Sequence, residues 1–215
     1  MNSKDTYRHK GLRKRLIDSI REKKMCDEKV LQAMAALPRH LFMDKAFEEL
    51  AYQDKAFPIG NDQTISQPLT VAIQSSLLMV QPREKILEVG TGSGYQAAIL
   101  GMLGGRVYTL ERHKALHLQA KKILHDLQLG NIRCFHRDGF KGLPEFAPFD
   151  KIIVTAGAKE VPQQLLKQLS IGGRMVIPVG EKVQDMLVIT RTDTDTYETE
   201  EKGSFRFVPF LKGLK

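Results

Sequence analysis

The chain has 215 residues, of which 42% are hydrophobic and 27% are charged. This composition is typical of a folded globular protein and excludes general disorder, and the length suits one domain with a modest extension. No apolar run approaches the ~18 residues of a membrane span, and the charged N-terminus lacks the apolar stretch of a secretory signal. The two widely separated cysteines, Cys26 and Cys134, exclude a disulfide framework and favour a reducing compartment, so we expect a cytoplasmic protein without membrane partners.

Most of the net charge of +8 lies in the first 24 residues, which contain nine Lys or Arg residues and three acidic ones. Leu12, Leu16, Ile17 and Ile20 recur there at helical spacing and predict an amphipathic helix over 9–24. Aromatic residues do not alternate with these charges, and no nucleic-acid motif is present. We therefore interpret the basic residues as a solvated helix face and expect no nucleic-acid partner.

The rest of residues 1–80 is predicted to be helix and loop. Asp27 suits the N-cap of a helix that carries apolar residues to Leu37 and stops before Pro38. Residues 51–68 are rich in Pro, Gly, Asn and Asp and predict a loop, and an apolar helix follows over 69–80.

From residue 85 onward, strands and helices alternate. Strands are expected at 85–89, 106–110, 131–136, 151–154 and 174–177, with helices at 95–103, 113–129 and 162–169. Two more strands, 186–191 and 204–210, flank a polar surface hairpin or loop at 192–202. Such alternation predicts an α/β fold with a doubly wound, mostly parallel sheet of about seven strands. We expect one domain over 1–215, in which an extension (1–80) packs on a core (81–215); the order of the last strands stays open.

A glycine-rich segment after the first of these strands is the strongest local signal for a ligand site. It is Glu88-Val89-Gly90-Thr91-Gly92-Ser93-Gly94, and a helix follows it. Glycines let a ligand approach the main chain, and the first turn of the helix offers free N–H groups. We expect Gly90, Thr91, Gly92, Ser93 and Gly94 to contact a cofactor.

Two acidic residues follow the next two strands and indicate a nucleoside. Glu111 ends the second strand, where a carboxylate can accept both hydroxyls of a ribose. Asp138 and Gly139 end the third strand, where an acid can meet the amino group of an adenine. Because these strand ends share one edge of a parallel sheet, the three signals together favour a nucleoside site over a ligand-free turn.

The position of Glu88 favours S-adenosylmethionine over NAD. A carboxylate two residues before the first glycine suits an ammonium group and opposes a pyrophosphate. The third glycine, Gly94, also comes one place earlier than in the dinucleotide fingerprint.

Ordered motifs over residues 10–213 resemble the protein-L-isoaspartate (D-aspartate) O-methyltransferase family. They are Pro38 to Phe42, Ala51-Tyr52, Pro58 to Gly60, Gln63 to Pro68 (QTISQP), Leu87 to Ala98 (LEVGTGSGYQAA), Phe149 to Thr155, Gly172 to Gly180 and Phe207 to Pro209. The glycine loop is shared by many methyltransferases, whereas QTISQP is much more specific to this family. The chain departs from the family pattern at Asp62, Gln74-Ser75-Ser76 and Gly157.

The resemblance implies a Rossmann-like, S-adenosylmethionine-dependent enzyme that methylates the free carboxylate of L-isoaspartyl and D-aspartyl residues in damaged proteins and peptides. The ester then closes to a succinimide, which starts repair. Ser66 matches the family's active-site serine, with Thr64, Ile65, Val208 and Pro209 on the substrate side. Glu88, Gly90, Gly92, Gly94, Glu111, Asp138 and Gly139 match the cofactor pocket.

The chemistry needs few residues, because the nucleophilic carboxylate is ionised at neutral pH and requires no general base. We expect no metal and interpret His113 and His117 as an ordinary helix face.

Two alternatives stay open: a methyltransferase for RNA or a small molecule, and a binding module without turnover. Thr155-Ala156-Gly157-Ala158 after the fourth strand lacks the motif of base N-methylation, and the intact QTISQP segment argues against lost turnover. We expect a monomer.

Overall fold

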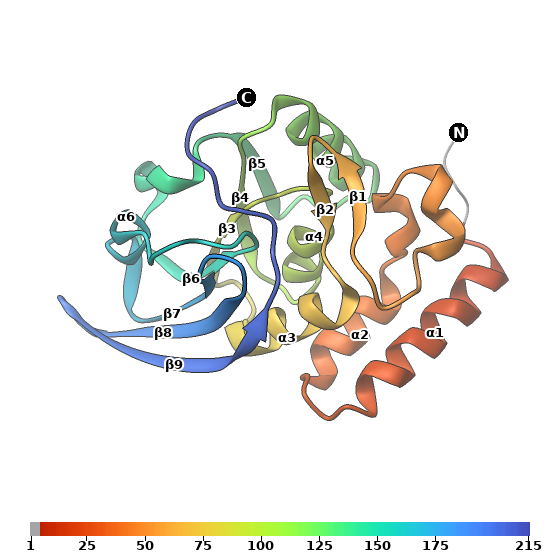
Figure 1. Cartoon of the computed structure of the whole chain (residues 1–215), viewed down its shortest axis with the longest axis horizontal. Helices are drawn as coiled ribbons and strands as arrows, with labels where there is room; N and C mark the ends of the chain where they lie inside the picture. Colours follow the sequence, from red (N-terminus) through yellow and green to blue (C-terminus); the bar gives the residue numbers. More distant parts are fainter. Residues whose placement is uncertain (1–4) are drawn as a thin grey trace.

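Seven strands form one sheet in the computed structural model, which describes residues 5–215 (Figure 1). Its spatial order is β5 (Ile132–His136), β4 (Arg106–Glu111), β3 (Lys85–Val89), β6 (Phe149–Val154), β7 (Leu169–Val179), β8 (Gln184–Asp193) and β9 (Thr196–Phe205). The first five strands in this spatial order, β5 to β7, are parallel to one another, and β8 and β9 are antiparallel to their neighbours. The predicted doubly wound, mostly parallel sheet is confirmed, and its last three strands lie in chain order.

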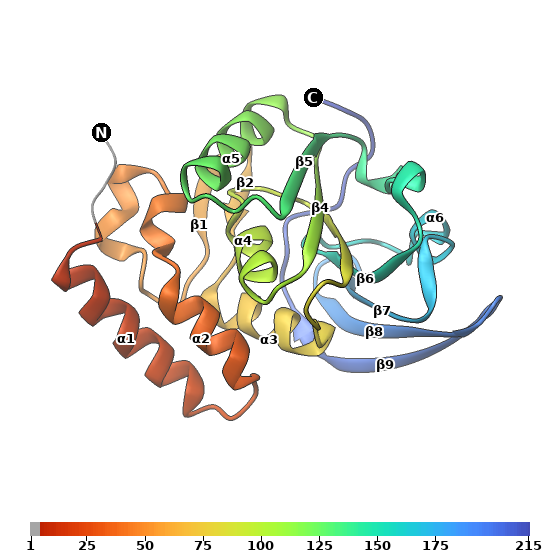
Figure 2. The same cartoon turned by 180° about the vertical axis from the view of Figure 1, so that it is seen from behind.

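Helices cover both faces of the sheet, because adjacent residues of each buried strand point to opposite sides. Ile86 of β3 packs in a core with α2 (Glu28–Ala36), α3 (Pro68–Leu78) and α4 (Tyr95–Met102), to which α5 (Lys114–Asp126) contributes Leu124. Leu87, the next residue, packs in a second core with α6 (Gln163–Leu166). Figure 2 shows the first group of helices from behind.

The N-terminal helix α1 (Tyr7–Arg21) packs against α2 and buries Leu16, Ile17 and Ile20, which confirms the predicted amphipathic helix with slightly shifted ends. Thr6 is its N-cap. Asp27 caps α2 as predicted, since its side chain accepts from Lys29 N–H at 2.7 Å. Residues 1–4, with Lys4 of the basic segment, lie outside the described residues.

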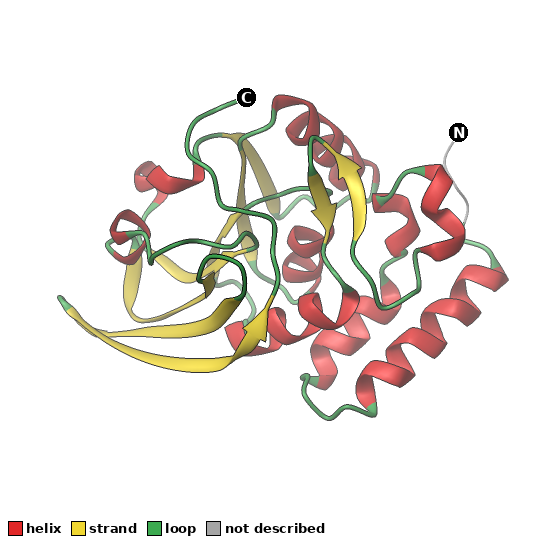
Figure 3. Ribbon diagram, in the orientation of Figure 1, coloured by secondary structure: helices red, strands yellow, loops and turns green. Residues whose placement is uncertain are grey.

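The expected loop at 51–68 instead contains a small hairpin of β1 (Phe57–Gly60) and β2 (Gln63–Ile65), separate from the main sheet (Figure 3). Asn61 and Asp62 form its turn with φ angles of 53° and 57°. Left-handed angles at both positions are typical of tight hairpin turns, and Asn and Asp adopt them more readily than other non-glycine residues. Asp62, one of the departures from the family pattern, therefore suits the turn.

The expected strand over 204–210 is wrong. Strand β9 begins earlier and ends at Phe205, so the polar stretch 192–202 belongs largely to the β8–β9 hairpin. Beyond it the chain leaves β8 and bonds the loop after β6: Gly157 N–H donates to Val208 O and Phe210 N–H donates to Gly157 O, both at 2.8 Å. Residues 206–215, the C-terminal segment, therefore lie across the carboxyl edge of the sheet (Figure 1).

Across residues 5–215, the structure contains no helix that is long and apolar enough to cross a membrane.

Candidate active site

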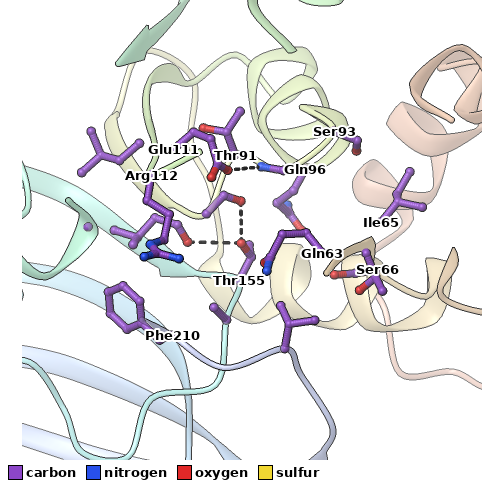
Figure 4. A pocket seen from close by; sticks show the side chains of 18 of the residues that line it. Gln63, Ile65, Ser66, Thr91, Ser93, Gln96, Glu111, Arg112, Thr155 and Phe210 are labelled. Atoms are coloured by element: carbon purple, nitrogen blue, oxygen red, sulfur yellow. Dashed lines mark hydrogen bonds between the residues drawn. The ribbon is translucent and has the colours of Figure 1, made fainter. Parts of the chain in front are cut away.

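A pocket lies at the carboxyl edge of the sheet, between β3 and β6, where the strand order reverses. Three segments far apart in the sequence line it: the β1–β2 hairpin, the glycine loop and the C-terminal segment (Figure 4). Of the predicted site residues, the lining includes Thr64, Ile65, Ser66, Gly90, Thr91, Gly92, Ser93, Glu111, Gly139, Val208 and Pro209.

Backbone hydrogen bonds hold the glycine loop against the sheet. Gly90 N–H and Thr91 N–H both donate to Leu110 O, at 2.9 and 3.1 Å. A Cβ on Gly90 would lie 2.4 Å from Thr155 Oγ1, and its φ of +102° also favours glycine. A side chain at position 90 would clash with Thr155, so glycine is required for the loop to pass this close to the end of β6.

Glu111 presents its carboxylate at the pocket wall with its orientation fixed. Oε2 accepts from Gly92 N–H at 2.8 Å, and Oε1 accepts from His113 N–H at 2.9 Å. Glu111 as a whole is 5% exposed, and its carboxylate oxygens keep free lone pairs for further donors. A pair of vicinal hydroxyls is the donor set that such an acid suits.

Three of the predicted cofactor residues are not in the lining: Glu88, Gly94 and Asp138. Gly94 is the N-cap of α4 with φ +89°, and a Cβ there would lie 3.3 Å from Ala120 of α5, so its place is explained by helix packing. Asp138 uses its two oxygens for Phe140 N–H and Gly213 N–H, both at 3.0 Å. These bonds tie the pocket's edge to the C-terminal segment.

Glu88 has no exposed surface and lies on the same sheet face as Ile86, toward the core that contains α2, α3 and α4. It lies opposite Thr109 of β4, which in turn lies opposite Cys134 of β5. Neither carboxyl oxygen forms a hydrogen bond of normal distance and angle among residues 5–215, although the nearby Thr109 hydroxyl opposes part of the rise in the pKa of Glu88. Burial, with a smaller contribution from the Glu111 charge, raises the pKa of Glu88 to about 8. Its carboxyl is therefore mainly protonated at neutral pH.

Ser66 follows the hairpin, and a buried arginine holds the main chain around it. Arg39 Nη2 donates to Ser66 O at 2.9 Å, and Arg39 Nε donates to Ala51 O at 3.0 Å. The guanidinium also lies 5.0 Å from the ring centroid of Tyr95. Burial lowers the pKa of Arg39 to about 10, so it stays charged at neutral pH. Arg39 thus connects the chain before and after the hairpin.

Several polar lining residues were not predicted. Thr155, at the end of β6, donates to Gly90 O at 2.7 Å; its position at a strand end on the sheet's carboxyl edge could have indicated it. Gln96 Nε2 donates to Ser75 Oγ at 2.7 Å, which leaves Gln96 Oε1 without a partner among the described residues. No local sequence signal distinguishes Gln96 from other residues of a buried helix.

The C-terminal segment forms the remaining wall. Phe210 stacks on Phe140 with ring centroids 4.0 Å apart. Arg112, another unpredicted lining residue, donates to Gly213 O at 2.9 Å and to Lys212 O at 3.2 Å. These contacts close the pocket above Glu111.

Gln74, Ser75 and Ser76, where the chain departs from the family pattern, all form hydrogen bonds with other elements. Gln74 Nε2 donates to Val154 O at 3.0 Å, and Ser76 Oγ accepts from Asp27 N–H at 2.8 Å. With the Ser75–Gln96 bond, the three residues connect α3 to β6, α4 and the start of α2.

Within residues 5–215, one group of three potential metal ligands exists, and none of them lines the pocket: Asp5, His9 and His40, with ligand atoms within 4.8 Å of one another. The Asp5 carboxylate is already paired with Arg13 at 2.9 and 3.0 Å, and a guanidinium at that distance opposes a bound cation. His113 and His117 belong to no such group in that range.

Comparison with known proteins agrees with this architecture. The family model described as protein-L-isoaspartate(D-aspartate) O-methyltransferase matches residues 11–215. A protein-L-isoaspartate O-methyltransferase of Christiangramia forsetii is 56% identical over 209 residues, which are 97% of this chain and 98% of that protein.

Solved structures share the fold. One protein-L-isoaspartate O-methyltransferase, 28% identical, superposes with a TM-score of 0.85 over 94% of this chain and 67% of that chain. A Plasmodium falciparum protein, 23% identical and determined in complex with S-adenosyl-L-homocysteine, has a TM-score of 0.83 over 94% of this chain and 99% of that one. The family match and the identity to the curated relative lead to one assignment. The chain belongs to the protein-L-isoaspartate(D-aspartate) O-methyltransferase family.

Proposed function

We propose that the protein transfers a methyl group from S-adenosylmethionine to the free carboxylate of L-isoaspartyl residues, and of D-aspartyl residues, in damaged proteins and peptides. The single observation that carries this proposal is the placement of Ser66. It lines the pocket of the glycine loop and also a second groove on the other side, together with Thr64, Thr155 and Val208. A side chain in a shared wall can contact a donor on one side and an acceptor on the other.

The residues present suit a nucleoside with a cationic amino-acid tail. Glu111 offers acceptors for ribose hydroxyls, and Leu110, Gly139 and Phe210 offer apolar surface beside it for an adenine. The unpartnered Gln96 Oε1 is the buried acceptor that an ammonium group would need. We assign this role to Gln96 and not to Glu88, because Glu88 lies outside the lining.

The bound cofactor supplies an electrophilic methyl group on a sulfonium. The chain's own residues orient the two reactants and exclude water. Ser66 donates its hydroxyl hydrogen to one oxygen of the substrate carboxylate and leaves the other free to attack. The carboxylate is ionised at neutral pH, so no residue has to remove a proton. Because opposite charges disappear as they react, a closed pocket roofed by Val208 to Leu211 favours the transfer.

We further propose that the enzyme works as a cytoplasmic monomer without a metal or a nucleic-acid partner. The ionised nucleophile makes a metal unnecessary for its activation, and most charges of α1 are engaged in ion pairs such as Arg13–Asp5 and Lys14–Asp18.

Transfer of label from tritiated S-adenosylmethionine tests the function. The protein is offered an isoaspartyl peptide, its normal aspartyl counterpart and a pool of RNA, each separately. Base-labile label in the isoaspartyl peptide alone supports the proposal. Equal label in both peptides, or label in RNA, would contradict it.

A further inference from the structure

The groove on the far side of Ser66 has its own walls. It runs from the shared wall to the first residues of α3 and the end of β9. Beyond the shared residues its lining includes Ala56, Gln67, Leu69, Thr70, Val183 and Arg206. A lining of hydroxyls, amides and apolar side chains suits an extended polypeptide better than a second nucleoside.

Arg206 is the one charged residue among the residues that line this groove. It is exposed, and it forms no ion pair with any of residues 5–215. Phe205 and Phe207, on either side of it, pack against the hydrophobic core, and Phe207 N–H donates to Gln184 Oε1 at 2.9 Å. The main chain on both sides is therefore held in place, while the guanidinium is left available to a ligand.

The surroundings of the groove carry both signs of charge. Lys55 and Lys182 are exposed cations next to the lining residues Ala56 and Val183. Asp54 accepts hydrogen bonds from Gln67 and Leu69 at 3.1 and 2.9 Å and forms an ion pair with Lys23, and Asp185 accepts a hydrogen bond from Ser204 at 2.9 Å. Because these acids are already engaged, the Arg206 guanidinium is the charge that the lining offers to a ligand. A groove with an unpaired guanidinium favours acidic ligands and disfavours basic ones.

We propose that this groove binds the polypeptide that flanks the damaged residue, and that Arg206 makes the enzyme select substrates with an acidic residue near the damaged site. This inference rests on the proposed function. Because Arg206 is exposed, its charge acts mainly on substrate capture, so the selection is expected in KM and is expected to weaken with salt. The methyl-transfer step takes place at Ser66, away from Arg206, so we expect kcat to be unaffected.

The test is a charge exchange between enzyme and substrate. Isoaspartyl peptides of one length carry Glu, Gln or Lys at single positions from three residues before to three residues after the isoaspartyl residue. KM and kcat are measured at low and high salt for the natural protein, Arg206→Gln and Arg206→Glu. Arg133→Glu, an exposed change on β5 at the other edge of the sheet, is the matched control.

For at least one position, the natural protein at low salt should have a KM about 3–10-fold lower for the Glu peptide than for the Lys peptide. Arg206→Gln should remove this difference, Arg206→Glu should reverse it, and Arg133→Glu should retain it. Affinity for S-adenosylhomocysteine, measured by calorimetry, verifies that each variant is folded. The same peptide ranking in Arg206→Glu as in the natural protein, at every position, would overturn the inference. Failure of the natural protein to methylate any isoaspartyl peptide would instead refute the proposed function.

Discussion

The two sides of the pocket are held in different ways. On the glycine-loop side, main-chain N–H groups of Gly90 and Thr91 bond to the end of β4, so the loop is continuous with the sheet. On the other side, Ser66 follows a hairpin outside the sheet, and the side chain of Arg39 bonds the chain before and after it. Changes on the first side should therefore alter cofactor affinity, whereas changes on the second should alter methyl transfer and leave cofactor affinity nearly unchanged.

The largest effect is expected for Ser66→Ala. Loss of the hydroxyl removes the donor that orients the substrate carboxylate, and we expect kcat to fall about 100-fold. The dissociation constant of S-adenosylhomocysteine should change by less than about twofold, because the glycine loop is untouched. Peptide methylation and calorimetric titration measure the two quantities. Full activity in this variant would refute the role of Ser66.

Arg39→Lys sharpens the comparison, because it keeps the charge and removes the planar array of donors. Without bonds to both Ala51 O and Ser66 O the hairpin should shift, and we expect kcat/KM for an isoaspartyl peptide to fall roughly 30-fold. Arg39→Met should lower it further. If either variant weakens S-adenosylhomocysteine binding by the same factor by which it lowers kcat/KM, then changes on the substrate side do alter cofactor affinity, and the comparison of the two sides is contradicted.

Glu111→Gln is the corresponding change on the cofactor side. The amide retains the size of the side chain but loses the charge and one acceptor, so we expect the dissociation constant of S-adenosylhomocysteine to rise about tenfold. At saturating S-adenosylmethionine, kcat should stay within about threefold of the natural value. An unchanged dissociation constant in calorimetric titration would exclude Glu111 from ribose binding.

Glu88→Gln should have the smallest effect on activity, because Glu88 lies outside the pocket lining, and it tests the pH dependence of stability. The pKa of Glu88 is about 8 in the folded protein and 4.5 in its ordinary state. Between these values the folded state binds more protons than the unfolded state, so the free energy of unfolding falls as the pH rises through this range. Glu88→Gln lacks this titration and should lose less stability between pH 5 and pH 9, by roughly 4 kcal/mol. Urea unfolding at several pH values measures the difference, and parallel pH profiles would show that Glu88 does not titrate in this way.

The sheet and the glycine loop could be predicted because their signals are local. Two strands with a tight turn and a helix between them, all within residues 85–111, place Gly90 and Glu111 at one edge without knowledge of distant contacts. The direction of Glu88 could not be predicted in this way, because a strand buried on both faces has no alternation of polar and apolar residues. The argument from its charge placed it beside the ligand, whereas the structure turns it into the core that contains α2, α3 and α4.

The substrate side was harder to predict because its contacts span the chain. The β1–β2 hairpin lacks a clear strand pattern, since Pro58 and Gly60 interrupt it. The bond from Arg39 to Ser66 joins residues 27 positions apart, and the bond from Asp138 to Gly213 joins residues 75 positions apart. Only the family resemblance indicated Ser66, and neither composition nor spacing indicated Arg39, Gln96 or Arg206.

A crystal structure with S-adenosylhomocysteine tests the central claim most directly. The account predicts that the ribose hydroxyls contact Glu111 and that the sulfur atom faces the wall formed by Ser66, with the groove of Arg206 open on the other side. A nucleoside bound in that groove, or a sulfur atom directed away from residue 66, would contradict it.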